Sequence, residues 1–397
     1  MSKMVLTGLE RIKTEPELRE NYKGNIGLLC HSASIDSKYN HSLEVFLECF
    51  GHQVKKVFGP QHGFVTDVQD NMIETDHFTH PYFKLPVYSL YSETRKPTDE
   101  MLKGIDHLFV DLQDVGTRIY TYIYTMTYIL EACAGKGIEV IILDRPNPIN
   151  AESVEGNVLD LKFASFVGRH ALPVRHGLTM GEVAKMHQQY WVKNKCNFSV
   201  IEMKNYERQM SFEQTKLPWV MPSPNLPTVE GCYTFAGTVL YEGTNISEGR
   251  GTTRPLELIG HPSLDPWNFK KHMDLVMKKN HLDGFILRAI NFQPTFQKHA
   301  GTTCGGLHIH VTDRELFKPW RVCQVLCQEL YHELGSEFKY KEDPYEYETD
   351  FNPVDMINGT DKIRHWYENR GLYGELVSFE DETLPLYMEQ RESILIC

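Results

Sequence analysis

HLFVDL, residues 107–112, and EVIIL, residues 139–143, flank a stretch at 120–135 whose apolar residues have helical spacing. Short runs of Val, Ile, Leu and Phe are typical of buried strands, and two such runs joined by a helix are typical of a β-α-β unit. The two strands of that unit lie parallel, and helices cover their sheet. This stretch therefore predicts an α/β protein.

The same alternation continues on both sides of this unit. Further strands are expected at 25–30, 53–58, 86–90 and 198–203, with helices at 42–50, 99–104 and 180–192. This order predicts a Rossmann-like, doubly wound parallel sheet. Neither a Gly-x-Gly-x-x-Gly sequence after the first strand nor a Walker-type lysine loop is present, so nucleotide chemistry is disfavoured and no cofactor is expected.

A proline-dense stretch, LPWVMPSPNLPTVE (217–230), ends this regular pattern. Because proline interrupts both helices and central strands, we place a domain boundary at the end of the stretch. A Rossmann-like N-terminal domain then covers 1–230, and a smaller α+β domain covers 231–397. In the second domain we expect helices at 266–280 and 319–334, strands at 285–290 and 307–311, and an acidic, tyrosine-rich tail.

The composition excludes several classes of protein. Hydrophobic residues make up 41% of the 397 residues and charged residues 24%, as in ordinary folded proteins. The net charge of −12 disfavours nucleic acid as a partner. No run reaches the roughly 18 apolar residues of a membrane span, so no membrane contact is expected. The absence of an apolar leader predicts a cytoplasmic protein, or a periplasmic one if a leader was removed. No oligomeric state is predicted.

Polar residues directly follow five of the predicted strands. They are His31, Gln61–Gly63, Glu93–Arg95, Gln113–Asp114 and Asp144–Asn147. In an open α/β sheet, ligands bind outside the carboxyl ends of the strands, so these five segments are predicted to meet at one cleft. The alternative interpretation is that they are polar only because loops begin where strands end.

Glu93 is the first candidate for acid–base chemistry. It lies among aromatic residues in YSLYSETRKPT (88–98), just after a predicted strand. A carboxyl group held there could have a raised pKa and donate a proton, as the cleavage of a glycosidic bond requires. The alternative is a surface glutamate paired with Arg95 or Lys96, which would lower its pKa instead.

Further carboxyl groups and arginines lie near the predicted cleft. A second acid or base could come from Asp111, Asp114, Asp144 or Glu155, although Asp111 lies within an apolar strand, where it could instead bond the backbone. Guanidinium groups bind carboxylates through paired hydrogen bonds, so two or three converging arginines would bind an acidic substrate. Each arginine alone is better explained by surface or structural pairing. The candidates are Arg118, Arg145, Arg169, Arg175, Arg250 and Arg254.

Metal chemistry and serine-hydrolase chemistry receive little support. His308 and His310 alternate on a predicted strand, with Cys304 nearby. A zinc site needs three or four ligands, and this spacing does not match the strong zinc motifs, so no metal is expected. No Gly-x-Ser-x-Gly sequence is present, which disfavours a standard serine hydrolase.

Several longer blocks, in order over nearly the whole chain, carry a specific resemblance. They are FGPQHGF (58–64), SETRKPT (92–98), DLQDVGTR (111–118), LDRPNP (143–148), VGR (167–169), PVRHG (173–177), PSPN (222–225), EGTNISEGRGTTRP (242–255) and HIHVTD (308–313). Together they resemble the NamZ (YbbC-like) family. The resemblance implies a glycoside hydrolase, an exo-β-N-acetylmuramidase, that releases terminal N-acetylmuramic acid from the non-reducing end of peptidoglycan-derived glycans.

The resemblance also implies a site in a cleft between a Rossmann-like domain and a C-terminal auxiliary domain. The glutamate of SETRKPT is the family's catalytic carboxylate, which is Glu93 here, and we take Asp114 as the candidate second group. Because N-acetylmuramic acid carries a lactyl carboxylate, arginines are expected in its pocket. The candidate substrate-binding residues are His62, Arg95, Arg118, Asp144, Asn147, Arg250 and Arg254.

One departure from the family puts its activity in question. Family members usually read Gly-Pro-Glu-His-Gly-Phe-Arg where this chain has Gln61 and Val65, so a carboxylate and an arginine are lost. The alternatives are a non-catalytic glycan-binding protein and a hydrolase that acts on another acidic amino sugar. The retained Glu93 and the arginine-bearing loops favour the enzyme.

Overall fold

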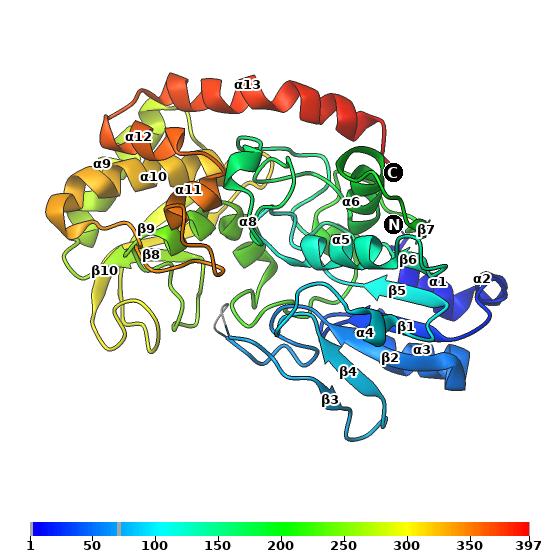
Figure 1. Ribbon diagram of the computed structural model, residues 1–397. Coiled ribbons are helices and arrows are strands. Elements are labelled where there is room, and N and C mark those ends of the chain that lie inside the picture. Colours follow the sequence, from blue (N-terminus) through cyan, green and yellow to red (C-terminus); the bar gives the residue numbers. More distant parts are fainter. Residues whose placement is uncertain (1–2, 70–72, 397) are drawn as a thin grey trace.

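The computed structural model describes residues 3–69 and 73–396, in which two sheets are surrounded by helices (Figure 1). The larger sheet has the order β3-β4-β2-β1-β5-β6-β7 and the smaller sheet the order β8-β10-β9. The strands of the larger sheet are β1 (Ile26–Cys30), β2 (Val54–Gly59), β3 (Phe78–Thr79), β4 (Pro86–Ser89), β5 (His107–Asp111), β6 (Glu139–Leu143) and β7 (Asn197–Ile201).

The larger sheet has the doubly wound topology. Its short edge strand β3 pairs antiparallel with β4, and all other neighbouring strands pair parallel. Without β3, the strands run in the order third, second, first, fourth, fifth, sixth along the chain, which is the Rossmann order. The predicted α/β class and Rossmann-like sheet are therefore confirmed.

Successive residues of the central strands point to opposite faces of this sheet. Leu28, Phe109 and Ile141 belong to one buried cluster together with residues of α3. Leu29 and Val110 belong to a second cluster, which includes α5. Because both faces are buried, these strands are apolar throughout. The helices of this part are α1 (Gly8–Thr14), α2 (Pro16–Arg19), α3 (Ser42–Phe50), η1 (Gly51–Gln53), α4 (Asp99–Leu102), α5 (Tyr122–Cys133), η2 (Leu161–Phe163), α6 (Met180–Met186), the π-helix η3 (His187–Trp191) and α7 (Phe212–Thr215).

The C-terminal part is α+β, as expected. Its antiparallel strands are β8 (Leu258–His261), β9 (Phe285–Phe292) and β10 (Cys304–Val311). Its helices are α8 (Val229–Thr238), η4 (Val239–Gly243), α9 (Pro266–Lys279), α10 (Pro319–Leu334), η5 (Gly335–Glu337), α11 (Pro353–Asn358), α12 (Lys362–Glu368) and α13 (Tyr373–Glu392). The predicted boundary at 230 falls at the start of α8, and the division into 1–230 and 231–397 stays a prediction.

The two parts share one apolar core. The buried cluster on one face of the large sheet extends from Val110 to Leu326 of α10 and Val354 of α11. Helix α13, red in Figure 1, runs back from the C-terminal part to the N-terminal part, so that the C-terminus lies beside α6. In 3–69 and 73–396, no helix combines the length and apolarity needed to cross a bilayer.

Candidate functional site

A narrow, partly open cavity of about 40 Å³ lies where the carboxyl edge of the large sheet meets the C-terminal part. A water molecule needs on the order of 10–15 Å³ in this measure. The narrow cavity therefore holds a few water molecules but not a sugar ring. Its polar lining comes from the loop after β2, the segment before α5, the proline-dense stretch and the C-terminal part: Gln61, His62, Thr121, Ser223, Asn225, Glu242, Arg250 and Glu346.

A chain of hydrogen bonds fixes the carboxyl group of Glu346 in this cavity. The Thr121 hydroxyl donates to Gln61 Oε1 at 2.6 Å, so the amide nitrogen of Gln61 faces Glu346 and donates to its Oε1 at 3.3 Å. The buried Tyr91 hydroxyl donates to the other oxygen, Oε2, at 2.9 Å. Two loops of the large sheet thus bond one side chain of the C-terminal part, and Thr121, in the segment before α5, orients Gln61.

The surroundings of Glu346 alter its acidity. Only 4% of the residue is exposed, and this burial raises the pKa of its carboxyl group to about 7, although the bonds from Tyr91 and Gln61 oppose the shift. Its backbone has a φ of 48°, in the left-handed region that non-glycine residues rarely adopt. A protonatable carboxyl group near neutral pH in a cleft is typical of a functional site.

A second carboxylate cluster forms the wall beside Glu346. Arg250 donates to Glu242 Oε1, and the Arg250 Nε atom lies 3.2 Å from Glu248 Oε1. The Tyr345 hydroxyl donates to Glu242 Oε2 at 2.5 Å. Burial alone would raise the pKa of Glu242, but the Arg250 guanidinium and the Tyr345 hydroxyl hold it below its ordinary value. Glu242 is therefore an ionised structural partner of Arg250, in contrast to Glu346.

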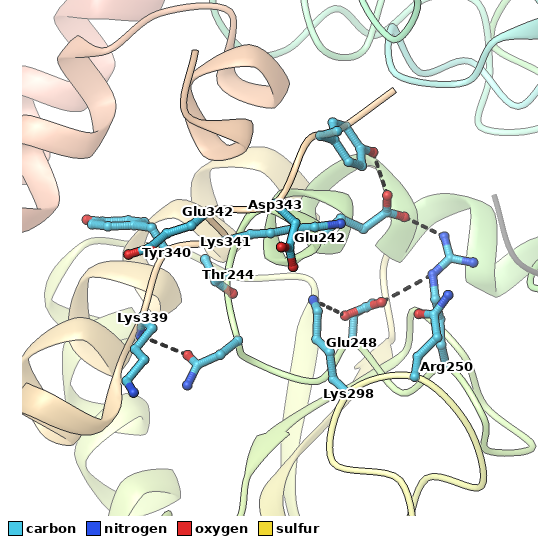
Figure 2. Close-up of a pocket in the computed structure, with 13 residues that line it drawn as sticks. Glu242, Thr244, Glu248, Arg250, Lys298, Lys339, Tyr340, Lys341, Glu342 and Asp343 are labelled. Carbon is cyan, nitrogen blue, oxygen red and sulfur yellow. Dashed lines mark hydrogen bonds and ion pairs between the residues drawn. The ribbon is translucent and has the colours of Figure 1, made fainter. Parts of the chain in front are cut away.

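A wide cavity of about 830 Å³ shares Glu242, Arg250 and Tyr345 with the narrow one (Figure 2). In Figure 2, Glu248 lies between Arg250 and Lys298, whose Nζ atom is 2.7 Å from Glu248 Oε2. The wide cavity has the size of a small-molecule site. Charged groups of both signs complete its lining: Lys298, Lys339, Lys341, Glu342 and Asp343.

The structure places two of the predicted substrate-binding residues on the narrow cavity. Arg250 separates it from the wide cavity, as described above. His62 also lines it, with Nδ1 2.8 Å from the Val68 carbonyl oxygen and Nε2 3.3 Å from the Ser223 hydroxyl. One ring nitrogen of His62 therefore holds its own loop, which fixes the ring against the cavity.

Glu93 lies in the loop after β4, two residues beyond Tyr91, and its side chain is exposed. Among residues 3–69 and 73–396, none forms a hydrogen bond or ion pair with the Glu93 carboxylate. The predicted pairing with Arg95 or Lys96 is thus not seen. Arg95 instead stacks over the rings of Tyr91 at 4.0 Å and Tyr347 at 4.9 Å, and lies 3.5 Å from Glu74.

Asp114 is buried next to β5. Its Oδ2 atom accepts a hydrogen bond from the Gly116 amide at 2.7 Å and lies 3.3 Å from His176 Nε2. Its Oδ1 atom has no hydrogen-bond partner among the described residues. The Asp114 carboxylate is not part of the narrow cavity lining, so the structure places it behind the cleft and not in it.

Three other predicted residues, Arg118, Asp144 and Asn147, are buried inside the protein. The guanidinium of Arg118 is fully buried and donates to the carbonyl oxygens of Asn157, Leu172 and Ile357 at 2.8–2.9 Å. Burial lowers the pKa of Arg118 to about 10. In this structure Arg118 thus bonds the backbone of the protein, and its role in substrate binding stays a prediction.

Asp144 and Asn147 hold loops together behind the cleft. Asp144 is fully buried and accepts hydrogen bonds from the Gly181 amide at 2.8 Å and the Thr179 hydroxyl at 2.9 Å, which anchors the start of α6. Burial raises the pKa of Asp144 to about 7. Asn147 donates to the Leu178 carbonyl oxygen at 3.0 Å. Neither side chain lines a described cavity, and both make structural contacts here, so their role in substrate binding stays a prediction.

Arg254 lies away from this cluster. Its side chain is half exposed, 3.5 Å from Glu257, and lines a third cavity of about 720 Å³ that also includes His308. His308 and His310 each bond Arg288, so the alternating pair forms a polar strand face. In the part of the chain that the structure describes, no group of His, Cys, Asp and Glu could hold a metal ion.

Comparison with known proteins identifies the family. The sequence model of the N-terminal domain of exo-β-N-acetylmuramidase NamZ matches residues 26–230, and the model of its C-terminal domain matches residues 233–396. The chain belongs to the NamZ family. The peptidoglycan β-N-acetylmuramidase NamZ of Bacillus subtilis (strain 168) is 38% identical over 393 residues, which are 99% of this chain and 91% of that protein.

Two solved structures share the fold of this NamZ family member. Both are DUF1343 family proteins from Bacteroides fragilis NCTC 9343. One is 27% identical with a TM-score of 0.88, and covers 99% of this chain and 98% of its own. The other is 28% identical with a TM-score of 0.75, and covers 99% of both chains. The arrangement of the two parts of the chain is thus common to NamZ-like proteins.

Sequence reasoning missed several residues of the NamZ cleft. Tyr91 lies in the stretch 88–98, where the sequence marks it only as an aromatic neighbour of Glu93. Glu242 is the first residue of the stretch 242–255, in which the arginines are the candidates. Glu346 lies in the acidic, tyrosine-rich tail, in the sequence DPYEYE (343–348). The sequence offers one local indication that Glu346 is buried, namely that it lies between two tyrosines, Tyr345 and Tyr347. The separation of 285 residues from Gln61 hid the contact.

Proposed function

We propose that the protein is an exo-acting β-N-acetylmuramidase, which releases terminal N-acetylmuramic acid from the non-reducing end of peptidoglycan-derived glycans. The observation that carries the proposal is the cluster at the edge of the large sheet. There a carboxyl group with a pKa near 7 and a buried arginine line one cleft beside the loop that bears Glu93. Family membership adds the reaction class, because relatives of this chain are named as N-acetylmuramidases.

In this proposal Glu93 is the general acid. Its exposed carboxyl group has no partner among the described residues and lines neither the narrow nor the wide cavity, so the proposal requires that the bound glycan extend from the cleft to the loop after β4, where Glu93 meets the glycosidic oxygen. Protonation of that oxygen lowers the barrier to breaking the bond between it and the anomeric carbon. Arg250 and the lysines of the wide cavity, Lys298 and Lys341, provide positive charge for the lactyl carboxylate of the sugar.

The experiment compares wild type with Glu93→Gln on two para-nitrophenyl glycosides, those of N-acetylmuramic acid and N-acetylglucosamine. Wild type is expected to release nitrophenol from the muramic substrate only. The variant is expected to lose the usual contribution of a general acid, a factor of about 10²–10⁴ in kcat, on a sugar leaving group and a smaller factor on the nitrophenyl glycoside, with little change in KM. Glu100→Gln, at an exposed position in α4, is the matched control and should retain full activity.

The leaving group supplies a second check on the role of Glu93. Nitrophenol leaves readily without protonation, whereas a sugar hydroxyl does not, so the variant should lose more activity on a muramic-acid-containing disaccharide than on the nitrophenyl glycoside. An equal loss on both substrates would contradict the general-acid role. No release by wild type from any muramic substrate would overturn the enzyme and favour a non-catalytic glycan-binding protein.

A further inference from the structure

We propose that Glu346 is a second catalytic residue, the general base that deprotonates the hydrolytic water inside the narrow cavity, and that the reaction consequently inverts the anomeric configuration. This inference rests on the proposed function and goes beyond it, because the residues that carry the family resemblance do not include Glu346. It also supplies the carboxylate that is missing at Gln61.

The hydrogen bonds around Glu346 suit a base. Both of its known partners donate: the Gln61 amide to Oε1 at 3.3 Å and the Tyr91 hydroxyl to Oε2 at 2.9 Å. Donors stabilise the ionised, acceptor-only form of a carboxyl group. Each carboxylate oxygen can accept more than one hydrogen bond, so Glu346 can bind a water while it keeps both partners.

Gln61 makes this role possible. The Thr121 hydroxyl bonds its Oε1 atom and so turns its amide nitrogen toward Glu346. A glutamate at position 61 would place two carboxyl groups about one hydrogen bond apart, and one of them would be protonated near neutral pH. With glutamine there, Glu346 has an amide and not a second carboxyl group as its hydrogen-bond partner, so it can ionise. The departure from the family sequence is therefore compatible with catalysis.

The cavity is built for water and not for the sugar. Its volume of about 40 Å³ holds a few waters, and its polar walls offer them bonding partners besides Glu346: Thr121, Ser223 and Asn225. Because the cavity is partly open, an anomeric carbon held at its mouth can be reached by a water inside. Inverting glycosidases need this arrangement, with room for a water between the base and the sugar.

The reaction balances with these two carboxyl groups. The water oxygen bonds the anomeric carbon while its proton passes to the Glu346 carboxylate. The bond between the anomeric carbon and the glycosidic oxygen breaks, its electron pair remains on that oxygen, and Glu93 protonates it. The products are α-N-acetylmuramic acid and the shortened glycan. Solvent then takes the proton from Glu346 and returns one to Glu93.

Several charged groups around Glu346 set the pH dependence. Burial raises its pKa to about 7, and the negative Glu242 raises it too, whereas Tyr91, Gln61 and Arg95 lower it. Activity needs the ionised base, so the titration of Glu346 is expected to give kcat/KM a limb that falls about tenfold per pH unit below about pH 7. Deprotonation of the general acid Glu93 gives a separate limb that falls as the pH rises. Further titratable groups that line the narrow cavity or face Tyr91 beside Glu346 are His62, Tyr120, Arg250, Tyr345 and Tyr347.

The first test uses only the wild-type enzyme. Proton NMR of a freshly started hydrolysis of a β-muramic glycoside should show the α anomer of N-acetylmuramic acid before mutarotation mixes the two. If the β anomer appears first, the reaction retains configuration and Glu346 is not its general base. That outcome leaves the muramidase activity itself intact, so the inference and the proposed function fail separately.

The second test removes the base. Glu346→Gln keeps the shape and should lower kcat by about 10²–10⁴-fold and abolish the acidic limb near pH 7, while Glu348→Gln, two residues away and outside both cavities, should do neither. Glu346→Ala with added azide should regain turnover and form the α-glycosyl azide, because azide needs no base. Full activity of Glu346→Gln, or no azide product from a folded Glu346→Ala, would overturn the inference.

Discussion

At the scale of single residues, acidity in the cleft depends on what each carboxyl group touches. Glu242 and Glu346 are both buried and share the narrow cavity. Glu242 is held ionised by Arg250, whereas the described hydrogen-bond donors to Glu346, Gln61 and Tyr91, are neutral, and its pKa is about 7. The same type of side chain is thus a structural anion at position 242 and, in our proposal, a proton acceptor at position 346.

Tyr91→Phe tests this dependence directly. The change removes the hydroxyl that donates to Glu346 Oε2 at 2.9 Å and leaves the ring in place. The ionised form of Glu346 then loses a charge-assisted hydrogen bond, so its pKa should rise by about one unit, the equivalent of about 1.4 kcal/mol. In a pH–rate profile the limb that belongs to Glu346 should move upward by that amount, whereas the limb that belongs to the general acid Glu93 should stay in place.

A control for this variant is Tyr82→Phe, whose ring is 81% exposed and which should leave the profile unchanged. An acidic limb that stays in place in Tyr91→Phe would mean that the limb belongs to another group than Glu346.

At the scale of elements, α8 and α10 pack unusually closely because glycine stands at their contact. A Cβ atom at Gly237 of α8 would lie 2.1 Å from the Pro319 carbonyl oxygen and 2.6 Å from Cys323 Sγ on α10. Such an atom cannot be accommodated unless the helices separate. Because η4, which follows α8 directly, carries Glu242, the position of the cleft wall depends on this packing.

Gly237→Ala should therefore destabilise the protein although alanine favours helices. Overpacking of a tight core costs about 1–3 kcal/mol or more, which exceeds the gain of up to about 1 kcal/mol from helix propensity. Urea denaturation followed by circular dichroism measures the free energy of unfolding. Gly374→Ala in α13, where a Cβ atom meets nothing within 4 Å, should be neutral or stabilising. Equal effects at both positions would contradict the packing argument.

The elements that sequence patterns predicted are those whose periodicity is local. Apolar runs of β1, β2, β5 and β6 and the spacing of α5 and α10 are visible without the rest of the chain. Helix α13 was missed, because Pro385 lies inside it and its exposed faces are strongly charged. The tail was therefore read as an acidic segment and not as a helix that packs on both parts.

The cleft was predicted in position but only partly in content. Loops at the carboxyl ends of strands do supply Gln61, His62 and Thr121, as the topology requires. Asp144 and Asn147 also follow a strand, yet their side chains bond the protein itself. Asp144 bonds the first turn of α6, and Asn147 bonds Leu178 in the segment just before α6. Sequence order cannot distinguish a strand-end residue that faces solvent from one that faces a neighbouring loop, and it cannot bring Glu346 to Gln61.

At the scale of the whole molecule, α13 joins parts that are far apart in sequence. The buried carboxylate of Glu380 accepts a hydrogen bond from the Gly156 amide at 2.8 Å on the N-terminal side and from Arg321 Nε of α10 at 2.7 Å. With the continuous apolar core, this contact leads us to expect that the two parts unfold as one cooperative unit. The walls of the cleft come from both parts, so their spacing depends on these contacts.

Glu380→Ala should weaken that unit more than a change elsewhere on the helix. It leaves a buried amide and a partly buried guanidinium without their acceptor, which costs about 2–4 kcal/mol. Glu382→Ala, exposed on the same helix, should change the free energy of unfolding by less than about 0.5 kcal/mol. Wild type should unfold in urea in a single transition. Two separate transitions, or equal stability of the two variants, would show that the parts fold independently and that α13 does not join them.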